Sequence, residues 1–131
     1  MKNKSSYKSL QKHVRSLKTP VIEVWENQYP DKRYCVNIDT SEFTCICPKT
    51  GLPDFAEIRI EYSPLKNCVE LKSFKEYLMF FRDIGIFHEH FVNKLMEDFA
   101  RACRPRWCKI TAKFNPRGGI TTTVTREYKK P

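Results

Sequence analysis

The sequence predicts an α+β domain with two helices packed on one face of a mostly antiparallel sheet. Segments in which apolar and polar residues alternate, as they do in strands, occur on both sides of the middle of the chain. Between them lie two segments whose apolar residues recur at helical spacing. Strands, then helices, then strands is the order typical of this fold class. A chain of 131 residues, 40% of them hydrophobic, is long enough for one such domain with a core.

Three strands are expected in the first half of the domain. The segment 21–27 (VIEVWEN) alternates and is typical of an edge strand. Residues 34–38 form a short alternating run that we expect to end at a turn at Thr40–Ser41. The segment 55–62 has the clearest alternation and carries Asp54 at its start, so it is predicted to be a strand of the main sheet.

Two helices follow. Apolar residues at i, i+3, i+4 and i+7 predict the first helix, with Gly85 placed to cap its C-terminal end. These residues are Phe74, Tyr77, Leu78 and Phe81. The second helix is expected over 89–101, and Arg104–Pro105 should stop it.

Two further strands, over 107–115 and 120–125, are predicted around the turn at 116–119. An open sheet in a chain this short leaves two edges, and no segment remains to form a third layer over them. We therefore expect neighbouring subunits to cover these edges.

The positive charge is concentrated at the N-terminus. Residues 1–20 contain six Lys or Arg and no acidic residue, so the net charge of +9 falls to +3 for residues 21–131. We expect residues 1–20 to be a basic, flexible arm and residues 21–131 to be the single folded domain. A basic, Ser-rich, acid-free start is also typical of an organellar transit peptide, and this alternative remains open.

The chain contains no run of 18 apolar residues, and its start lacks the apolar core of a secretory signal. We therefore expect a soluble, cytoplasmic protein that does not bind a membrane. The six cysteines contain no CxxC pair, so in this setting they are predicted to be thiols.

The segment Phe43–Asp54 (FTCICPKTGLPD) is the candidate centre of the chemistry. It joins a thiol, Cys47, to a carboxylate, Asp54, through a short connection that contains two prolines and Gly51. Proline fixes φ and glycine permits positive φ, so this loop should hold one shape and aim both side chains at one point. The alternative is that Cys47 only fills a small apolar gap and Asp54 only caps a turn.

Several common chemistries are excluded by the sequence. Its four glycines cannot form a GxGxxG dinucleotide fingerprint or a phosphate-binding P-loop, and no GxSxG nucleophile motif occurs. A metal site is not expected either, because CxC, HxH and CxxxxC spacings match structural zinc sites poorly. The residues considered for such a site are Cys45, Cys47, His88, His90, Cys103 and Cys108.

Four motifs together resemble the 7-cyano-7-deazaguanine reductases, the nitrile reductases of queuosine biosynthesis, in their short single-domain form. The motifs are FTCICPKTGLPDFA, VELKSFKEY, FRDIGIFHEHF and FNPRGG, in this order. The chain departs from the family pattern at Glu76 and at Cys45, and the second departure raises the chance of an oxidised Cys45–Cys47 pair. The resemblance implies a tunnelling fold (T-fold) whose subunits form rings, typically two stacked pentamers, with active sites between subunits.

The resemblance also implies the reaction, a four-electron reduction of a nitrile to a primary amine in which two NADPH are consumed. Cys47 matches the family nucleophile, which adds to the nitrile carbon and forms a covalent thioimide. Asp54 matches the residue that protonates the nitrile nitrogen.

The resemblance further implies the binding residues. Glu89 matches the glutamate that binds the guanine-like edge of the substrate, and His88 lies beside it. A second substrate contact is formed by Val69, Glu70 and Leu71. The candidates for the NADPH phosphates are Lys72, Lys75 and Arg117.

Two alternatives remain open. One is a zinc-dependent, pterin-type T-fold enzyme, which a metal assay would separate from the reductase. The other is a small basic RNA-binding module, which would bind tRNA tightly and with strong salt dependence. The nearly even charge of residues 21–131 weighs against nucleic acid as a direct partner.

Overall fold

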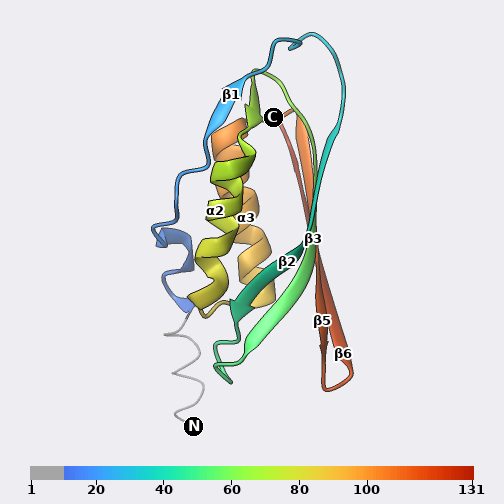
Figure 1. Cartoon of the computed structure of the whole chain (residues 1–131). Helices are drawn as coiled ribbons and strands as arrows, with labels where there is room; N and C mark the ends of the chain where they lie inside the picture. The colour runs from blue at the N-terminus through green and yellow to red at the C-terminus, as the bar shows by residue number, and fades with distance from the viewer. Residues whose placement is uncertain (1–10) are drawn as a thin grey trace.

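The protein is described here by a computed structural model that places residues 11–131 (Figure 1). A four-stranded antiparallel sheet has the order β2-β3-β5-β6, and a separate two-stranded sheet pairs β1 with β4. Helices α2 and α3 cover one face of the larger sheet (Figure 1). The predicted α+β arrangement is therefore confirmed. The bounds are η1 Val14–Ser16, β1 Val24–Glu26, β2 Val36–Ile46, β3 Pro53–Ser63, β4 Asn67–Val69, α2 Leu71–Phe80, η2 Phe81–Asp83, α3 His88–Cys103, β5 Trp107–Arg117 and β6 Ile120–Lys129.

The predicted turn at Thr40–Ser41 is wrong, because β2 continues through it. Thr40 pairs with Ile58 and Phe43 pairs with Ala56, so two residues of β2 oppose one of β3 at this point. Such a β-bulge adds a residue without ending the strand. Beyond the bulge, Phe43 is buried against the helices, and β2 leads directly to the loop that carries the candidate nucleophile.

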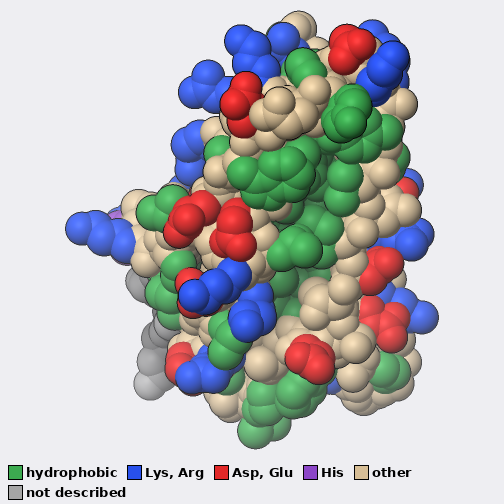
Figure 2. Space-filling model, turned by 45° about the horizontal axis from the view of Figure 1, so that its top comes forward, with side chains coloured by type: hydrophobic (Ala, Val, Ile, Leu, Met, Phe, Trp, Pro, Cys, Tyr) green, Lys and Arg blue, Asp and Glu red, His purple; other side chains and the backbone are tan. Residues whose placement is uncertain are grey.

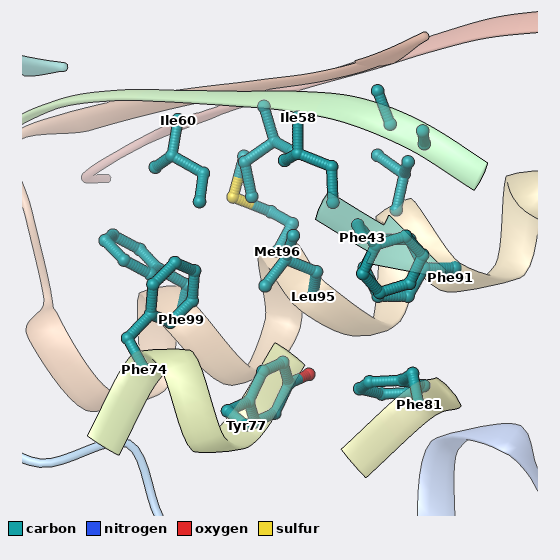
Figure 3. Packing of buried hydrophobic residues seen from close by; sticks show 14 of the residues in the cluster. Phe43, Ile58, Ile60, Phe74, Tyr77, Phe81, Phe91, Leu95, Met96 and Phe99 are labelled. Atoms are coloured by element: carbon teal, nitrogen blue, oxygen red, sulfur yellow. The ribbon is translucent and has the colours of Figure 1, made fainter. Parts of the chain in front are cut away.

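The core lies between the larger sheet and the two helices (Figure 3). β3 alternates buried and exposed positions along most of its length, as its sequence predicts. From the sheet side, the Phe43 ring stacks on that of Phe91 at 4.2 Å between centroids. The helices contribute the predicted apolar stripes, whose buried members include Phe74, Tyr77, Val92, Leu95, Met96 and Phe99.

Gly85 does not cap the first helix, which corrects the prediction. α2 ends at Phe80 and continues into the short 3-10 turn η2, with the N–H of Phe81 donating to the carbonyl of Leu78. The ring of Phe81 is fully buried, and this anchors the turn before Gly85 is reached. Gly85 instead forms a bridge with Ile46 at the end of β2. The end of α3 agrees with the prediction, since Arg104 adopts a left-handed conformation there.

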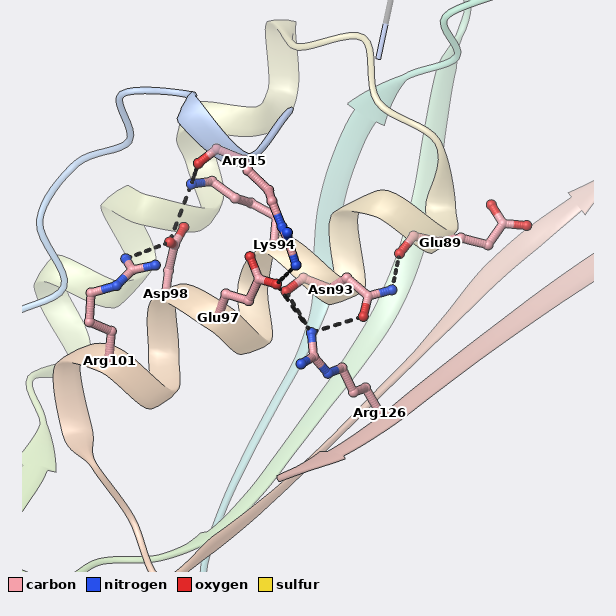
Figure 4. Close-up of polar contacts among 8 residues, drawn as sticks. All are labelled: Arg15, Glu89, Asn93, Lys94, Glu97, Asp98, Arg101 and Arg126. Atoms are coloured by element: carbon pink, nitrogen blue, oxygen red, sulfur yellow. Dashed lines mark hydrogen bonds and ion pairs between the residues drawn. The ribbon is translucent and has the colours of Figure 1, made fainter. Parts of the chain in front are cut away.

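The N-terminal part that the structure describes packs against α3. Val14 and Leu17 are half-buried against the core. Arg15 pairs with Glu97 at 2.7 Å, and the Nζ of Lys94 donates to the carbonyl of Arg15 at 3.0 Å (Figure 4). The predicted arm spans residues 1–20, and its first ten residues lie outside those described. Within residues 11–131, no helix has both the length and the apolar character needed to cross a membrane.

Candidate active site

Cys47 is the first residue after β2, at the start of the turn that joins β2 to β3. Its N–H donates to the carbonyl of Leu52 at 2.9 Å, and its own carbonyl accepts from the N–H of Gly51 at 2.9 Å. Gly51 has a φ of 73°, which glycine adopts without the steric cost that a Cβ imposes. Two hydrogen bonds across six residues give this turn a defined shape, as the loop sequence predicts.

The surroundings of Cys47 favour its thiolate form. Partial burial acts to raise the pKa of the thiol, but hydrogen bonds from the Thr50 hydroxyl and from the backbone N–H groups of Thr50 and Lys49 outweigh it. The pKa of Cys47 therefore lies below its ordinary value. Donors that point at sulfur stabilise its negative charge, and the thiolate is the nucleophilic form. The turn thus activates the thiol that it carries.

Asp54 lies at the start of β3 and is buried, with 5% of its surface exposed. One carboxylate oxygen, Oδ1, accepts a hydrogen bond from Arg117 at 2.9 Å. The other, Oδ2, lies 3.1 Å from the Nε2 atom of His88. The same Arg117 nitrogen donates to the carbonyl of Pro53 at 2.9 Å, so it fixes both the backbone and the side chain at this point. Three segments far apart in sequence therefore meet at one carboxylate.

His88 is the first residue of α3, and its ring position is set by stacking. The imidazole lies 3.6 Å from the ring of Phe114 on β5, with an angle of 3° between the planes. This contact directs Nε2 toward Asp54. When the carboxylate is ionised, Nε2 must carry the proton, because a carboxylate only accepts hydrogen bonds. The pair is thus able to hold and pass a proton at the position next to the Cys47 turn.

Glu89 follows His88 in the first turn of α3 and is exposed. Its carboxylate points away from the ion pairs along the rest of the helix (Figure 4). It makes no ion pair or hydrogen bond with any residue of the described part, 11–131. An unpaired carboxylate at the start of α3, one residue after His88, is free to accept two hydrogen bonds from a ligand.

The other predicted binding residues lie at the far end of α2. Glu70 is the N-cap of this helix, where its two oxygens accept from the N–H groups of Ser73 at 2.7 Å and Lys72 at 2.9 Å. These backbone hydrogen bonds lower the pKa of Glu70. Val69 is buried in β4, whereas Leu71 is 60% exposed. A helix of ten residues is about 15 Å long. Figure 1 places its start near β1 and β4, and the β2–β3 turn at the opposite end.

Of the ten predicted residues, the structure brings Asp54, His88 and Arg117 into direct contact and places Cys47 close enough for the charge of Asp54 to act on its thiol. Glu89 follows His88 in the chain and makes no contact with these residues. The remaining five lie at the end of β4 and along the first half of α2: Val69, Glu70, Leu71, Lys72 and Lys75. Arg117, expected with the two lysines, is instead bonded to Asp54. The sequence did not point to two further residues of the site. Phe114 stacks on the ring of His88, and Thr50 forms hydrogen bonds to the sulfur of Cys47.

The cysteines and histidines considered for zinc do not converge. Among residues 11–131, no group of three or more His, Cys, Asp or Glu is arranged to hold a metal ion. All six cysteines are free thiols, Cys45 and Cys47 included. Burial, together with the nearby charges of Asp54 and Cys47, raises the pKa of Cys45 to about 12. Cys45 is therefore a protonated core thiol.

Comparison with known proteins gives consistent matches. A family model described as QueF-like protein matches residues 53–131. The NADPH-dependent 7-cyano-7-deazaguanine reductase of Syntrophus aciditrophicus is 53% identical over 84% of this chain and 79% of its own length. The enzyme of the same name from Chlorobaculum tepidum is 50% identical over 84% of this chain and 94% of its own.

Among solved structures, the apo form of the archaeosine synthase QueF-Like is similar. It matches with a TM-score of 0.66 and 27% identity, over 71% of this chain and 91% of that one.

Proposed function

The chain belongs to the QueF family, and from this premise we infer that it is the NADPH-dependent reductase of 7-cyano-7-deazaguanine. It is an oxidoreductase that converts the nitrile of this base to an aminomethyl group in queuosine biosynthesis. The T-fold implied by the motifs agrees with the solved structure that the chain resembles. One observation supports placing this reaction at the β2–β3 turn. The turn holds the Cys47 thiol, whose pKa is lowered, and it is followed by the buried carboxylate of Asp54 near the start of β3.

The first chemical step uses these two residues. The thiolate sulfur of Cys47 forms a bond to the nitrile carbon, and one carbon–nitrogen π bond breaks. The electron pair moves to nitrogen, which takes a proton from Asp54, and the product is a neutral thioimide. Asp54 must therefore carry a proton when the sulfur attacks. His88, bonded to the same carboxyl group at 3.1 Å, is placed to return a proton to it afterwards.

Two NADPH, bound in turn, would each supply one of the two hydrides that complete the reduction. The residues that fit its phosphates are Lys72 and Lys75, two exposed cations three positions apart on α2. Neither forms an ion pair with a residue of the described part, 11–131, so both charges are available. Arg117 donates a hydrogen bond to Asp54, so it can contact the NADPH phosphates as a third cation only if this bond breaks.

Glu89 is assigned to substrate recognition. Its carboxylate oxygens fit the ring N–H and exocyclic amine of a guanine-like edge, as a carboxylate fits a guanidinium. Glu89 follows directly on His88, whose ring is fixed by Phe114, so the base would be held with its nitrile toward the Cys47 turn. No residue of the described part of the chain donates a hydrogen bond to the Glu89 carboxylate, so both of its oxygens can accept from the base.

We propose that a second copy of the chain completes the site by bringing its own Glu70 group to the Cys47 turn. The two groups of predicted residues lie at opposite ends of α2, so one subunit does not bring Glu70 to Cys47. Within residues 11–131, no strand pairs with the outer edge of β6, and the outer edge of β2 is paired only at Ile46, which bridges to Gly85. Next to β2 an apolar groove of about 430 Å³ runs along α2, with Leu71 and Met79 exposed on its wall. Figure 2 shows hydrophobic side chains gathered along the middle of this face.

A homo-oligomer in which one subunit's sheet edge lies against its neighbour's would cover both the edges and the groove. We propose a ring assembly, a pentamer or a decamer of two rings, which light scattering on the purified protein measures directly. A monomer that turns over substrate would contradict this part of the proposal. The cytoplasmic location and the absence of a direct nucleic-acid partner stay predictions.

The reaction is tested by following NADPH absorbance when the protein meets 7-cyano-7-deazaguanine. We expect two NADPH to be oxidised per nitrile in the wild type and none with Cys47→Ala. Oxidation that persists in the variant would remove Cys47 from the mechanism. No oxidation by an intact, reduced wild-type protein would overturn the assignment of the reaction, and a zinc assay would then test the pterin-type alternative.

A further inference from the structure

The start of α3 carries two assigned site residues but has no cap from its own sequence. The first N–H groups of a helix lack partners within it, and a polar N-cap side chain normally accepts from one of them. Here the N-cap residue is Phe87, whose ring cannot accept such a bond. The orientation of His88 and Glu89 therefore depends on contacts from elsewhere in the chain.

Gln11 supplies these contacts from 76 positions away. Its Oε1 atom accepts from the N–H of Phe87 at 3.3 Å and lies 2.7 Å from the Nδ1 atom of His90. Its Nε2 atom donates to the carbonyl of Gly85 at 3.3 Å. A single amide side chain thus bridges the backbone on both sides of Ile86.

The orientation of the amide follows from the backbone groups that it meets. The carbonyl of Gly85 can only accept, and the N–H of Phe87 can only donate. The Gln11 oxygen must therefore face Phe87, and the nitrogen must face Gly85. The same oxygen then requires that Nδ1 of His90 carries a proton and donates to it. All three contacts are satisfied by one arrangement.

The segment 84–87 is held on its other side by the strand that leads to the nucleophile. The N–H of Ile46 donates to the carbonyl of Ile84, and the N–H of Ile86 donates to the carbonyl of Ile46, both at 3.0 Å. Ile46 directly precedes Cys47. A Cβ added to Gly85 would lie 3.7 Å from the Cα of Pro48, so this segment passes close beside the Cys47 turn.

Gln11 is itself fixed to the helix that it caps. Arg15, four residues later, forms a 2.7 Å ion pair with Glu97, and its carbonyl accepts from the buried Lys94. Val14 packs against the core between them. Residues 11–17 therefore pack across α3, and Gln11 contacts the start of this helix.

We propose that Gln11 is a positioning residue for the active site. It clamps the segment 84–87 against the end of β2 and so sets the distance between the Cys47 turn and the pair His88–Glu89. This inference rests on the proposed function, because it gives the clamp the task of aligning the nitrile held by Glu89 with the sulfur of Cys47. It also assigns a catalytic purpose to part of the basic N-terminal region.

The test compares Gln11→Met with Lys12→Met. Methionine keeps the length of glutamine but removes its donor and its acceptor, whereas Lys12 is the exposed neighbour with no hydrogen bond in the described part of the chain. We expect Gln11→Met to weaken substrate binding about tenfold, the order expected for the loss of one or two hydrogen bonds. Amide exchange at Phe87 and in the first turn of α3 should become faster, and Lys12→Met should change neither quantity.

A second variant separates positioning from loss of packing. Gln11→Glu keeps the oxygen that accepts from Phe87 and His90 but loses the donor to Gly85, so we expect it to restore most of the exchange protection at Phe87. Unchanged affinity and unchanged exchange in Gln11→Met would overturn the inference. A wild-type protein that neither binds nor reduces the nitrile would instead overturn the proposed function, and amide exchange would still decide whether Gln11 clamps the helix start.

Discussion

Replacing Asp54 by Asn tests the proton-transfer step most sharply, because the structure indicates that the variant keeps its fold. The amide oxygen can take the bond from Arg117 that Oδ1 now accepts at 2.9 Å. The amide nitrogen can donate to Nε2 of His88, now 3.1 Å from Oδ2, once the imidazole proton moves to Nδ1. The variant therefore loses one charge-assisted contact, which costs about 1 to 3 kcal/mol of folding free energy.

The effect on chemistry should be larger than the effect on stability. A positioned general acid contributes about 10²- to 10⁴-fold to a rate, which corresponds to roughly 3 to 5 kcal/mol of barrier. We therefore expect thioimide formation to slow by about 10²- to 10⁴-fold. Substrate affinity should change little, since Asp54 is buried behind the turn and Glu89 is assigned to hold the base.

The assay for this prediction separates the two quantities. Quenched reactions without NADPH, followed by intact mass, give the rate at which the covalent adduct forms. Calorimetry in a Cys47→Ala background, with and without Asp54→Asn, gives the affinity without the covalent step. An adduct rate equal to that of the wild type would refute the role of Asp54. A fall in affinity as large as the fall in rate would show that Asp54 binds substrate instead.

Three further predictions follow from individual contacts. Thr50→Val removes a hydrogen bond to the candidate nucleophile, so its pKa should rise and the pH profile of iodoacetamide alkylation should move to higher pH, whereas Thr50→Ser should keep the wild-type profile. Glu89→Gln should weaken substrate binding about 10- to 100-fold, measured by calorimetry, whereas Asp31→Asn in the exposed loop after β1 should leave it unchanged. Tyr77→Phe removes a 2.6 Å hydrogen bond to the buried carboxylate of Asp98 and should lower the free energy of unfolding in urea by about 2 kcal/mol; an unchanged value would mean that the bond adds nothing.

Long elements with strong periodicity were predictable from the sequence. The strand now seen as β3 and the helix now seen as α3 have alternation or helical spacing over ten or more residues, and both occur within a few residues of the predicted bounds. β4 was missed because three residues carry no usable period. The sequence predicts a turn at Thr40–Ser41, where the structure has a bulge, because local sequence does not show that the partner strand continues opposite it.

In the site, too, contacts within one loop were predictable from the sequence, whereas contacts between distant elements were not. Cys47 and Asp54 could be paired from sequence because a short, stiff loop joins them. The stacking of His88 on Phe114 could not, since these residues lie on different elements and are brought together only by the packing of α3 on β5. Glu70 is a further example, because its carboxylate caps α2, a role that the motif alone does not reveal.

The claim that Cys47 forms a covalent thioimide is tested most directly by intact mass spectrometry of the protein mixed with 7-cyano-7-deazaguanine in the absence of NADPH. We expect a mass increase equal to one molecule of the nitrile per chain, located at Cys47 by peptide mapping, and reversed when NADPH is added. No mass increase should occur in Cys47→Ala. An adduct on another cysteine, or turnover in the wild type with an adduct never detected at any time, would show that Cys47 does not form the thioimide.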